Sequence, residues 1–154
     1  MLDIAIIAVG GLKFRPWAEA AAEYIKRLKP YARLKVIEVE AAPFNHSSRA
    51  KSRQEEAERL GRALEKIAFG ASVFLLEEGG EALDSLALAR RLEKINQPLV
   101  FVIGGALGLE PNFSGRYPKL SLSPLTFTHE MARVILLEQL YRAATIIGGK
   151  TYHY

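Results

Sequence analysis

Hydrophobic residues along this chain fall into short runs that alternate with amphipathic segments. Nearly continuous apolar runs occupy residues 2–9, 72–76 and 99–103, as expected of strands buried on both faces of a parallel sheet. Residues 34–39 alternate only partially, which predicts a half-exposed strand at a sheet edge. A further short apolar run ends in the loop 122–127.

Apolar positions at helical spacing separate these runs. They predict helices from Pro16 to about Pro30, from the polar, basic loop 41–52 to Ile67, from a cap at Asp84 or Ser85 to Pro98, and over 130–147. In the third helix we expect a buried face of Leu86, Ala89, Leu92 and Ile95. Alternating strands and helices predict a mostly parallel α/β sheet with helices on both faces and right-handed crossovers.

The last helix, over residues 130–147, is apolar almost all the way round. A helix of this kind must be covered on more than one side. One face can lie on the sheet, and in a chain this small a second subunit is the best cover for the other. The pattern therefore predicts a homodimer.

Two strand ends open into loops of unusual composition. Gly104-Gly105 follows the strand 99–103, and the loop 122–127 mixes apolar residues with Ser123, Pro124 and Thr126. Because ligands of open α/β proteins bind beyond the carboxyl ends of parallel strands, these loops predict a binding pocket. A tight turn and a plain strand-to-helix connection are the alternative interpretations. The order GGALG does not match the dinucleotide fingerprint G-x-G-x-x-G.

Composition narrows the function classes. The 154 residues fit one domain over 1–154, are 49% hydrophobic and 25% charged, and carry a net charge of +4, which is compatible with an anionic partner such as nucleic acid. Cysteine is absent, so disulfides and thiolate chemistry are excluded. Neither a membrane span nor a signal peptide is evident, and we expect a cytoplasmic protein. The three histidines have no metal-ligand spacing, and hydrolase and NTPase signatures are missing.

Two groups of residues near the C-terminus could contact an anion or a base. His129 and Arg133 lie four residues apart at the start of the last helix, where partial positive charge favours a phosphate. A capping region with one solvated arginine is an equal alternative. His153, between Tyr152 and Tyr154, is expected to be exposed and could stack on an unpaired RNA base.

Several segments together resemble the bacterial RlmH family of SPOUT-class methyltransferases. The resemblance covers essentially the whole chain and is most specific in its C-terminal third. It is carried by IAVG at 7–10, FVIGGALGL at 101–109, LSLSPLTFTH at 120–129, Arg133-Val134, EQLYRA at 138–143 and Tyr152-His153.

The resemblance implies an S-adenosyl-L-methionine-dependent rRNA methyltransferase. Its reaction would be methylation of N3 of a pseudouridine in 23S rRNA, pseudouridine-1915 in the helix 69 stem-loop, within the large subunit or the assembled ribosome. The implied fold is a SPOUT-type α/β knot with a C-terminal trefoil knot, in a homodimer without metal. Family members hold the cofactor at the positions of Leu76, Gly104, Gly105, Leu122, Ser123, Pro124, Leu125, Thr126 and Phe127.

The same resemblance assigns the C-terminal residues to the RNA. Family members use the positions of His129, Arg133, Arg142, Tyr152 and His153 around the RNA. We add Tyr154 to the expected RNA contacts and assign catalytic roles to Arg142, Tyr152 and His153. The terminal exposure of His153, and the ability of an imidazole to exchange protons near neutral pH, motivate the hypothesis that it positions or deprotonates the acceptor base. The tail of one subunit would complete the pocket of the other. The chain departs from the family in ending with Tyr154 where a basic residue is usual, and in Lys150-Thr151 where His-Pro is usual.

Two alternatives remain open. One is a SPOUT enzyme with another RNA target, for which the tail departures and the basic stretch 49–53 could be responsible. The other is a ribosome-binding module that keeps the fold without catalysis.

Overall fold

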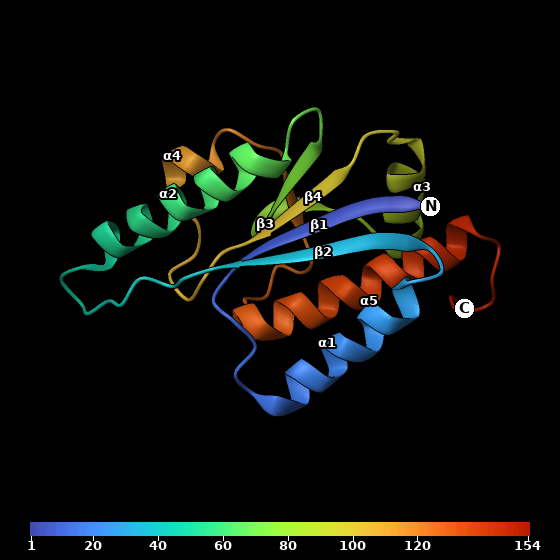
Figure 1. Ribbon diagram of the computed structural model, residues 1–154, viewed down its shortest axis with the longest axis horizontal. Coiled ribbons are helices and arrows are strands. Elements are labelled where there is room, and N and C mark those ends of the chain that lie inside the picture. The colour runs from blue at the N-terminus through green and yellow to red at the C-terminus, as the bar shows by residue number, and fades with distance from the viewer.

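A computed structural model describes residues 1–154 and shows a five-stranded, entirely parallel sheet (Figure 1). The strand order is β2-β1-β4-β3-β5. The strands are β1 (Leu2–Val9), β2 (Ala32–Val39), β3 (Ser72–Ala82), β4 (Leu99–Ile103) and β5 (Lys119–Ser121). β4 is buried throughout, whereas β2 lies at an edge and is only partly buried, which confirms the two predictions made from hydrophobic pattern.

Helices cover both faces of the sheet, as predicted. The helices are α1 (Arg15–Leu28), α2 (Arg49–Ile67), α3 (Ser85–Lys94), α4 (Pro111–Ser114) and α5 (His129–Ile147). One core joins the sheet to α1, α3 and α5, and a second joins it to α2 and α4. Figure 1 shows α1 and α5 side by side below the sheet, with α2 and α4 above it.

Three local predictions need correction. The third strand continues past Leu76 to Ala82, because its far end pairs with β5. In α3, Leu88 is buried and Leu86 is 42% exposed, because the helix begins at Ser85 and turns its Leu88, Ala89 and Leu92 face to the core. The short helix α4 was not predicted, since four residues show no periodicity, whereas β5 is the strand expected before the loop 122–127.

The last helix is covered more completely within the chain than its sequence suggested. α5 packs between α1 and α3 and buries Leu136, Leu137 and Leu140 fully. Tyr141, Ile146 and Ile147 remain partly exposed. The homodimer and the C-terminal knot stay predictions. No helix combines the length and apolarity that crossing a membrane requires.

Candidate functional site

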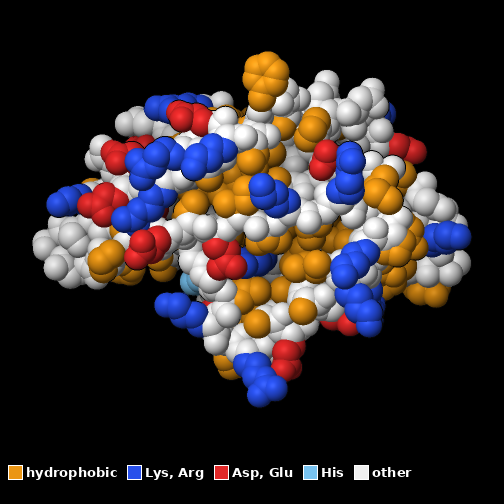
Figure 2. All heavy atoms as spheres, viewed as in Figure 1, with side chains coloured by type: hydrophobic (Ala, Val, Ile, Leu, Met, Phe, Trp, Pro, Cys, Tyr) orange, Lys and Arg blue, Asp and Glu red, His pale blue; other side chains and the backbone are white.

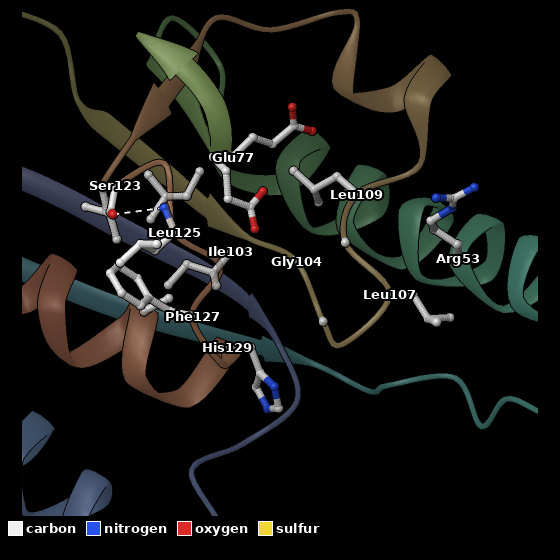
Figure 3. A pocket seen from close by; sticks show the side chains of 16 residues that line it. Arg53, Glu77, Ile103, Gly104, Leu107, Leu109, Ser123, Leu125, Phe127 and His129 are labelled. Carbon is white, nitrogen blue, oxygen red and sulfur yellow. Dashed lines mark hydrogen bonds between the residues drawn. The ribbon is translucent and has the colours of Figure 1, made fainter. Parts of the chain in front are cut away.

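A pocket of about 290 Å³ lies beyond the carboxyl end of β4 and beside Leu76 to Glu78 of β3, where the pairing of β3 with β5 is interrupted (Figure 3). We call it the strand-end pocket. Its walls come from β3, β4, the glycine-rich loop after β4, the loop before α5 and the first turns of α5. Its lining residues include Leu76, Glu77, Gly104, Gly105, Phe127 and His129. The structure therefore has a cavity where the two glycine- and proline-marked loops predicted one.

Most of the predicted cofactor positions meet in this pocket. The residues that line it are Leu76, Gly104, Gly105, Leu122, Ser123, Leu125 and Phe127. Pro124 and Thr126 belong to the same loop without lining the cavity. The Ser123 hydroxyl accepts a hydrogen bond from the Leu125 N–H at 3.0 Å, so the loop is held in a tight turn (Figure 3). Leu125 is 70% exposed at the mouth and is available to cover a ligand.

The absence of side chains at Gly104 and Gly105 creates the floor of the pocket. A Cβ atom on Gly104 would stand 3.1 Å from Leu109 Cδ2, and one on Gly105 would stand 2.9 Å from Val9 Cγ1. Both contacts are at or below the limit of real Cβ packing. Backbone N–H and C=O groups can therefore be approached directly at this strand end, and no other residue type fits there without movement.

Two acidic residues at the pocket were not anticipated from the sequence. Glu77 and Glu78 line the cavity from the irregular part of β3, where pairing with β5 is interrupted between Leu76 and Glu81. The Ser121 hydroxyl donates to the Glu78 carbonyl at 2.9 Å and fixes this bulge. The two glycines after Glu78 are a sequence signal for this bulge. The pairing of β3 with β5 beyond the bulge depends on tertiary structure and is not visible in the sequence.

A buried carboxylate beneath the glycine-rich loop was also missed. Glu56 of α2 is 4% exposed, and its Oε2 accepts a hydrogen bond from the Ala42 N–H at 3.1 Å. Burial raises the pKa of Glu56, against the lowering effects of the Ala42 N–H and of the charges on Arg59 and His129. A signal for it existed, because Glu56 stands one helical turn before Leu60 on the apolar stripe of α2.

The start of α5 is anchored to the loop after β1. The Thr128 hydroxyl accepts from the Met131 N–H at 3.3 Å as the helix cap, and Glu130 accepts from the Phe14 N–H at 3.0 Å. The hydrogen bond from Phe14, together with one that the Lys13 N–H donates to Glu130, holds the pKa of Glu130 below its usual value. His129 is thereby placed at the edge of the strand-end pocket.

Arg133 is not solvated, contrary to the capping alternative. It is 3% exposed, donates to the Gly10 carbonyl at 2.8 Å and pairs with Glu38 at 3.3 Å. Its guanidinium thus ties α5 to the ends of β1 and β2. In this arrangement Arg133 supports the pocket from behind, whereas His129 reaches it.

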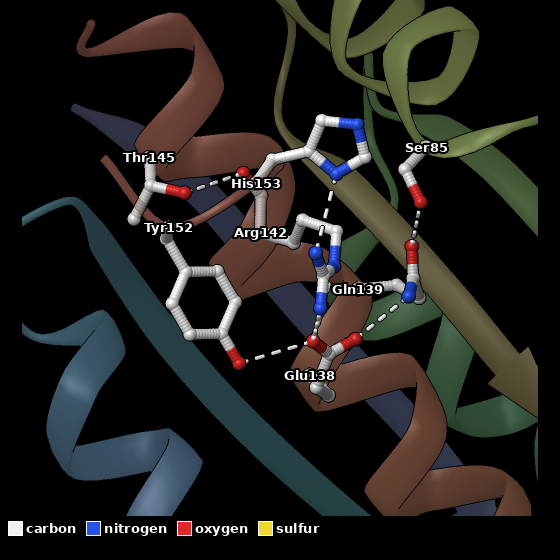
Figure 4. Close-up of polar contacts among 7 residues, drawn as sticks. All are labelled: Ser85, Glu138, Gln139, Arg142, Thr145, Tyr152 and His153. Atoms are coloured by element: carbon white, nitrogen blue, oxygen red, sulfur yellow. Dashed lines mark hydrogen bonds and ion pairs between the residues drawn. The ribbon is translucent and has the colours of Figure 1, made fainter. Parts of the chain in front are cut away.

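The C-terminal tail packs against α5, and His153, which was expected to be exposed, is partly buried. Arg142, Tyr152 and His153 gather around Glu138, and we call these four residues the tail cluster (Figure 4). Tyr152 stacks edge-on against Tyr141 with ring centroids 4.7 Å apart. Tyr154, at the end of the tail, is fully exposed.

Hydrogen bonds occupy the polar groups of the tail cluster. Glu138 accepts from Arg142 Nε and from the Tyr152 hydroxyl, each at 3.1 Å, and Arg142 Nη1 lies 3.2 Å from His153 Nδ1. Burial, together with hydrogen bonds to Tyr24 and Glu138, raises the pKa of Tyr152, so its hydroxyl stays protonated. The Glu138 hydrogen bond likewise raises the pKa of Arg142.

Comparison with known proteins decides the family. A family model described as "Predicted SPOUT methyltransferase" matches residues 2–153. The chain belongs to the SPOUT methyltransferase family. A relative from Methanoregula boonei is named "Putative ribosomal RNA large subunit methyltransferase H". It is 44% identical over an alignment of 161 positions that covers 99% of each protein. The resemblance stated from sequence is thus confirmed.

Solved structures show the same SPOUT fold at low identity. The match to TrmJ from Z. mobilis ZM4 covers 93% of this chain and 70% of the TrmJ chain, with 14% identity and a TM-score of 0.54. A probable methylase family protein from Haemophilus influenzae Rd KW20 matches 99% of the chain and 70% of its own, with 13% identity and a TM-score of 0.56. At these identities the likeness concerns the fold alone.

In this SPOUT methyltransferase the two groups of site residues lie at opposite ends of one helix. His129 belongs to the strand-end pocket and Arg142 to the tail cluster. They are thirteen positions apart in α5, which corresponds to roughly 20 Å of helix. Within one chain, therefore, the tail cluster does not reach the pocket.

Proposed function

We propose that this SPOUT methyltransferase transfers a methyl group from S-adenosyl-L-methionine to N3 of a pseudouridine in 23S rRNA of the large ribosomal subunit. The observation that carries the proposal is the strand-end pocket, built from the cofactor positions of the RlmH resemblance, in a chain whose relative is named for rRNA methylation. The same proposal includes a cytoplasmic homodimer with a C-terminal knot.

The residues of the pocket fit the cofactor. Leu76, Ile103, Leu122 and Phe127 offer apolar surface for a flat purine, and the glycine-rich loop offers backbone groups at close range. Glu77 and Glu78 can receive the hydroxyl and ammonium groups of such a ligand. When bound, S-adenosyl-L-methionine supplies a methyl group activated by a positively charged sulfur.

The tail cluster suits the acceptor base through position and not through proton removal. An arginine N–H can only donate, so His153 Nδ1 accepts from Arg142 and the neutral ring carries its proton on Nε2. That Nε2–H can donate to a carbonyl oxygen of the acceptor base. Of the two roles considered for His153, the geometry therefore supports positioning, and the N3 proton leaves to water.

A second subunit would unite the two ends of α5. Because His129 of the pocket and Arg142 of the tail cluster are roughly 20 Å apart along the helix, the tail of one protomer is proposed to cover the pocket of the other. The partly exposed side chains of Tyr141, Ile146 and Ile147 provide apolar surface for such an interface near the tail.

RNA contacts are proposed around the pocket mouth. His129 is at its edge and Tyr154 is free to stack on a base, whereas the proposed contact of Arg133 would require it to leave Glu38. Figure 2 shows Lys and Arg side chains gathered over α2, and Arg53 of that helix lines the pocket. These side chains can neutralise backbone phosphates.

The proposed reaction is tested by incubating the protein with methyl-labelled S-adenosyl-L-methionine and intact ribosomes, separate subunits or free rRNA from a strain lacking the enzyme. Label should enter 23S rRNA, and digestion should place it on N3 of a pseudouridine. Label at another nucleotide would favour the alternative target, for which the basic stretch 49–53 is a structural reason. Absence of label with retained ribosome binding would favour the non-catalytic module.

A further inference from the structure

Three buried side-chain atoms in this chain have no hydrogen-bond partner: Arg53 Nε, Glu56 Oε1 and Arg133 Nε. All three belong to helix ends that meet at the carboxyl edge of the sheet, around the strand-end pocket. Buried polar atoms almost always have a partner, and leaving one unpaired costs free energy. Their concentration here indicates that this edge is arranged for something other than stability.

Glu56 lies directly against the glycine-rich loop that lines the pocket. Its two carboxylate oxygens would each stand 3.2 Å from a Cβ atom on Gly105. Gly105 lines the cavity, so its backbone lies between the carboxylate and the space that a ligand would occupy. Oε2 is held by the Ala42 N–H, whereas Oε1 is the oxygen without a partner.

We propose that Glu56 makes the pocket select a cationic methyl donor over its neutral product. The inference rests on the proposed function and deepens it. The donor carries a positive sulfonium; when its methyl carbon bonds to the acceptor nitrogen, the C–S electron pair stays on sulfur and a neutral thioether remains. A buried negative charge beneath Gly105 attracts the positive sulfonium of the donor and not the neutral thioether of the product. Glu56 thereby favours loading of the donor and release of the product.

The surrounding charges leave this role to Glu56. Glu77 and Glu78 also line the pocket, but both are in contact with solvent, where water screens their charge. Arg53 lies on the far side of the cavity, beside Leu107 and Leu109, with its guanidinium pointing away from Phe127 and Ser123 (Figure 3). The charges that act on Glu56 are those of Arg59, which does not line the pocket, and of His129, which does.

The test compares two ligands that differ by one methyl group and one charge. Wild type, Glu56→Gln and Glu58→Gln are titrated calorimetrically, without RNA, with S-adenosyl-L-methionine and with S-adenosylhomocysteine. Glu58 is an exposed residue of the same helix and controls for the loss of one charge. Gln keeps an oxygen for the Ala42 N–H, so a purely structural role of Glu56 is preserved.

We expect E56Q to weaken binding of the cationic donor by about tenfold and to change binding of the neutral product by less than about twofold. E58Q should match wild type. Equal changes for both ligands, or none, would overturn the inference while leaving the proposed function intact. Wild type that binds neither ligand would reject both. Should E56Q fail to fold, Glu56→Met removes the charge at similar length and gives the same readout.

Discussion

The two ends of α5 differ in how their polar groups are satisfied. Beside the strand-end pocket, Arg53, Glu56 and Arg133 each retain one unpaired buried atom. At the tail cluster, Glu138 accepts from Arg142 and Tyr152, and the Gln139 amide donates to its other oxygen at 2.7 Å. Unpaired groups mark a place where a ligand can supply partners, whereas a closed network holds side chains in fixed positions. The pocket end is therefore suited to binding, and the tail end to orienting.

Filling the floor of the pocket should have the largest effect on binding. Gly105→Ala places a Cβ 2.9 Å from Val9 Cγ1 and 3.2 Å from the Glu56 oxygens. We expect affinity for S-adenosyl-L-methionine to fall by more than about 100-fold, as measured by calorimetry, because the loop must move. Gly61→Ala is the matched control, since nothing lies within 4 Å of that position. If G105A binds S-adenosyl-L-methionine with unchanged affinity, the pocket floor is not part of the binding site.

Removing the tail imidazole should affect turnover and spare cofactor binding. We expect His153→Ala to lower kcat by between about 10- and 100-fold with an unaltered affinity for S-adenosyl-L-methionine. Because Arg142 fixes Nδ1 as the acceptor, the factor should be the same across pH 6–9. His153→Asn, which keeps an N–H donor, should recover part of the rate. A factor that grows as the pH rises from 6 to 9 would restore the general-base role.

The buried arginine behind the pocket should matter for stability. Arg133→Met removes the hydrogen bond to Gly10 and the ion pair with Glu38, and we expect it to lower the free energy of unfolding by about 2 kcal/mol in urea titration. Arg33→Met, which breaks the exposed pair with Asp3, should change it by less than about 0.5 kcal/mol. Equal effects of the two variants would contradict the supporting role of Arg133.

The smallest expected effect is a stability gain from neutralising Glu56. Burial raises the pKa of Glu56 above its ordinary value, so the folded state holds the proton more tightly than the unfolded state. Stability is therefore lost as pH rises from the ordinary pKa of 4.5 through the raised value. We expect Glu56→Gln to unfold at a higher temperature than wild type at pH 7, with a smaller difference at pH 4. A lower melting temperature at pH 7 would show that Oε1 has a partner.

Hydrophobic pattern was sufficient for the layers of this fold and for the location of the pocket. Runs such as residues 99–103 are buried wherever they occur, so their position in the sheet follows from composition. The loop residues of the pocket follow from the rule that ligands bind at strand ends. Glu77 and Glu78 were missed because the strand containing them continues only through pairing with β5.

Residues whose roles depend on distant partners were harder to predict. The tail was expected to be exposed because nothing near Tyr152 in the sequence indicates Tyr141 as its packing partner. Arg133 was assigned to phosphate or solvent, since its partners, Gly10 just after β1 and Glu38 of β2, are far from it in the sequence. Glu56 could have been found, because its spacing from Leu60 and Leu64 places a carboxylate on an apolar stripe.

The central claim is that the two ends of α5 form one active site across a dimer. Mixing two variants, each impaired at one end, tests this claim most directly. G105A carries an intact tail and H153A carries an intact pocket, so an equimolar exchanged mixture should contain one complete site in each heterodimer. With random exchange, we expect methyl transfer to ribosomes at about one quarter of the wild-type rate, far above either variant alone. A mixture no more active than the average of the two separate variants would contradict the shared site.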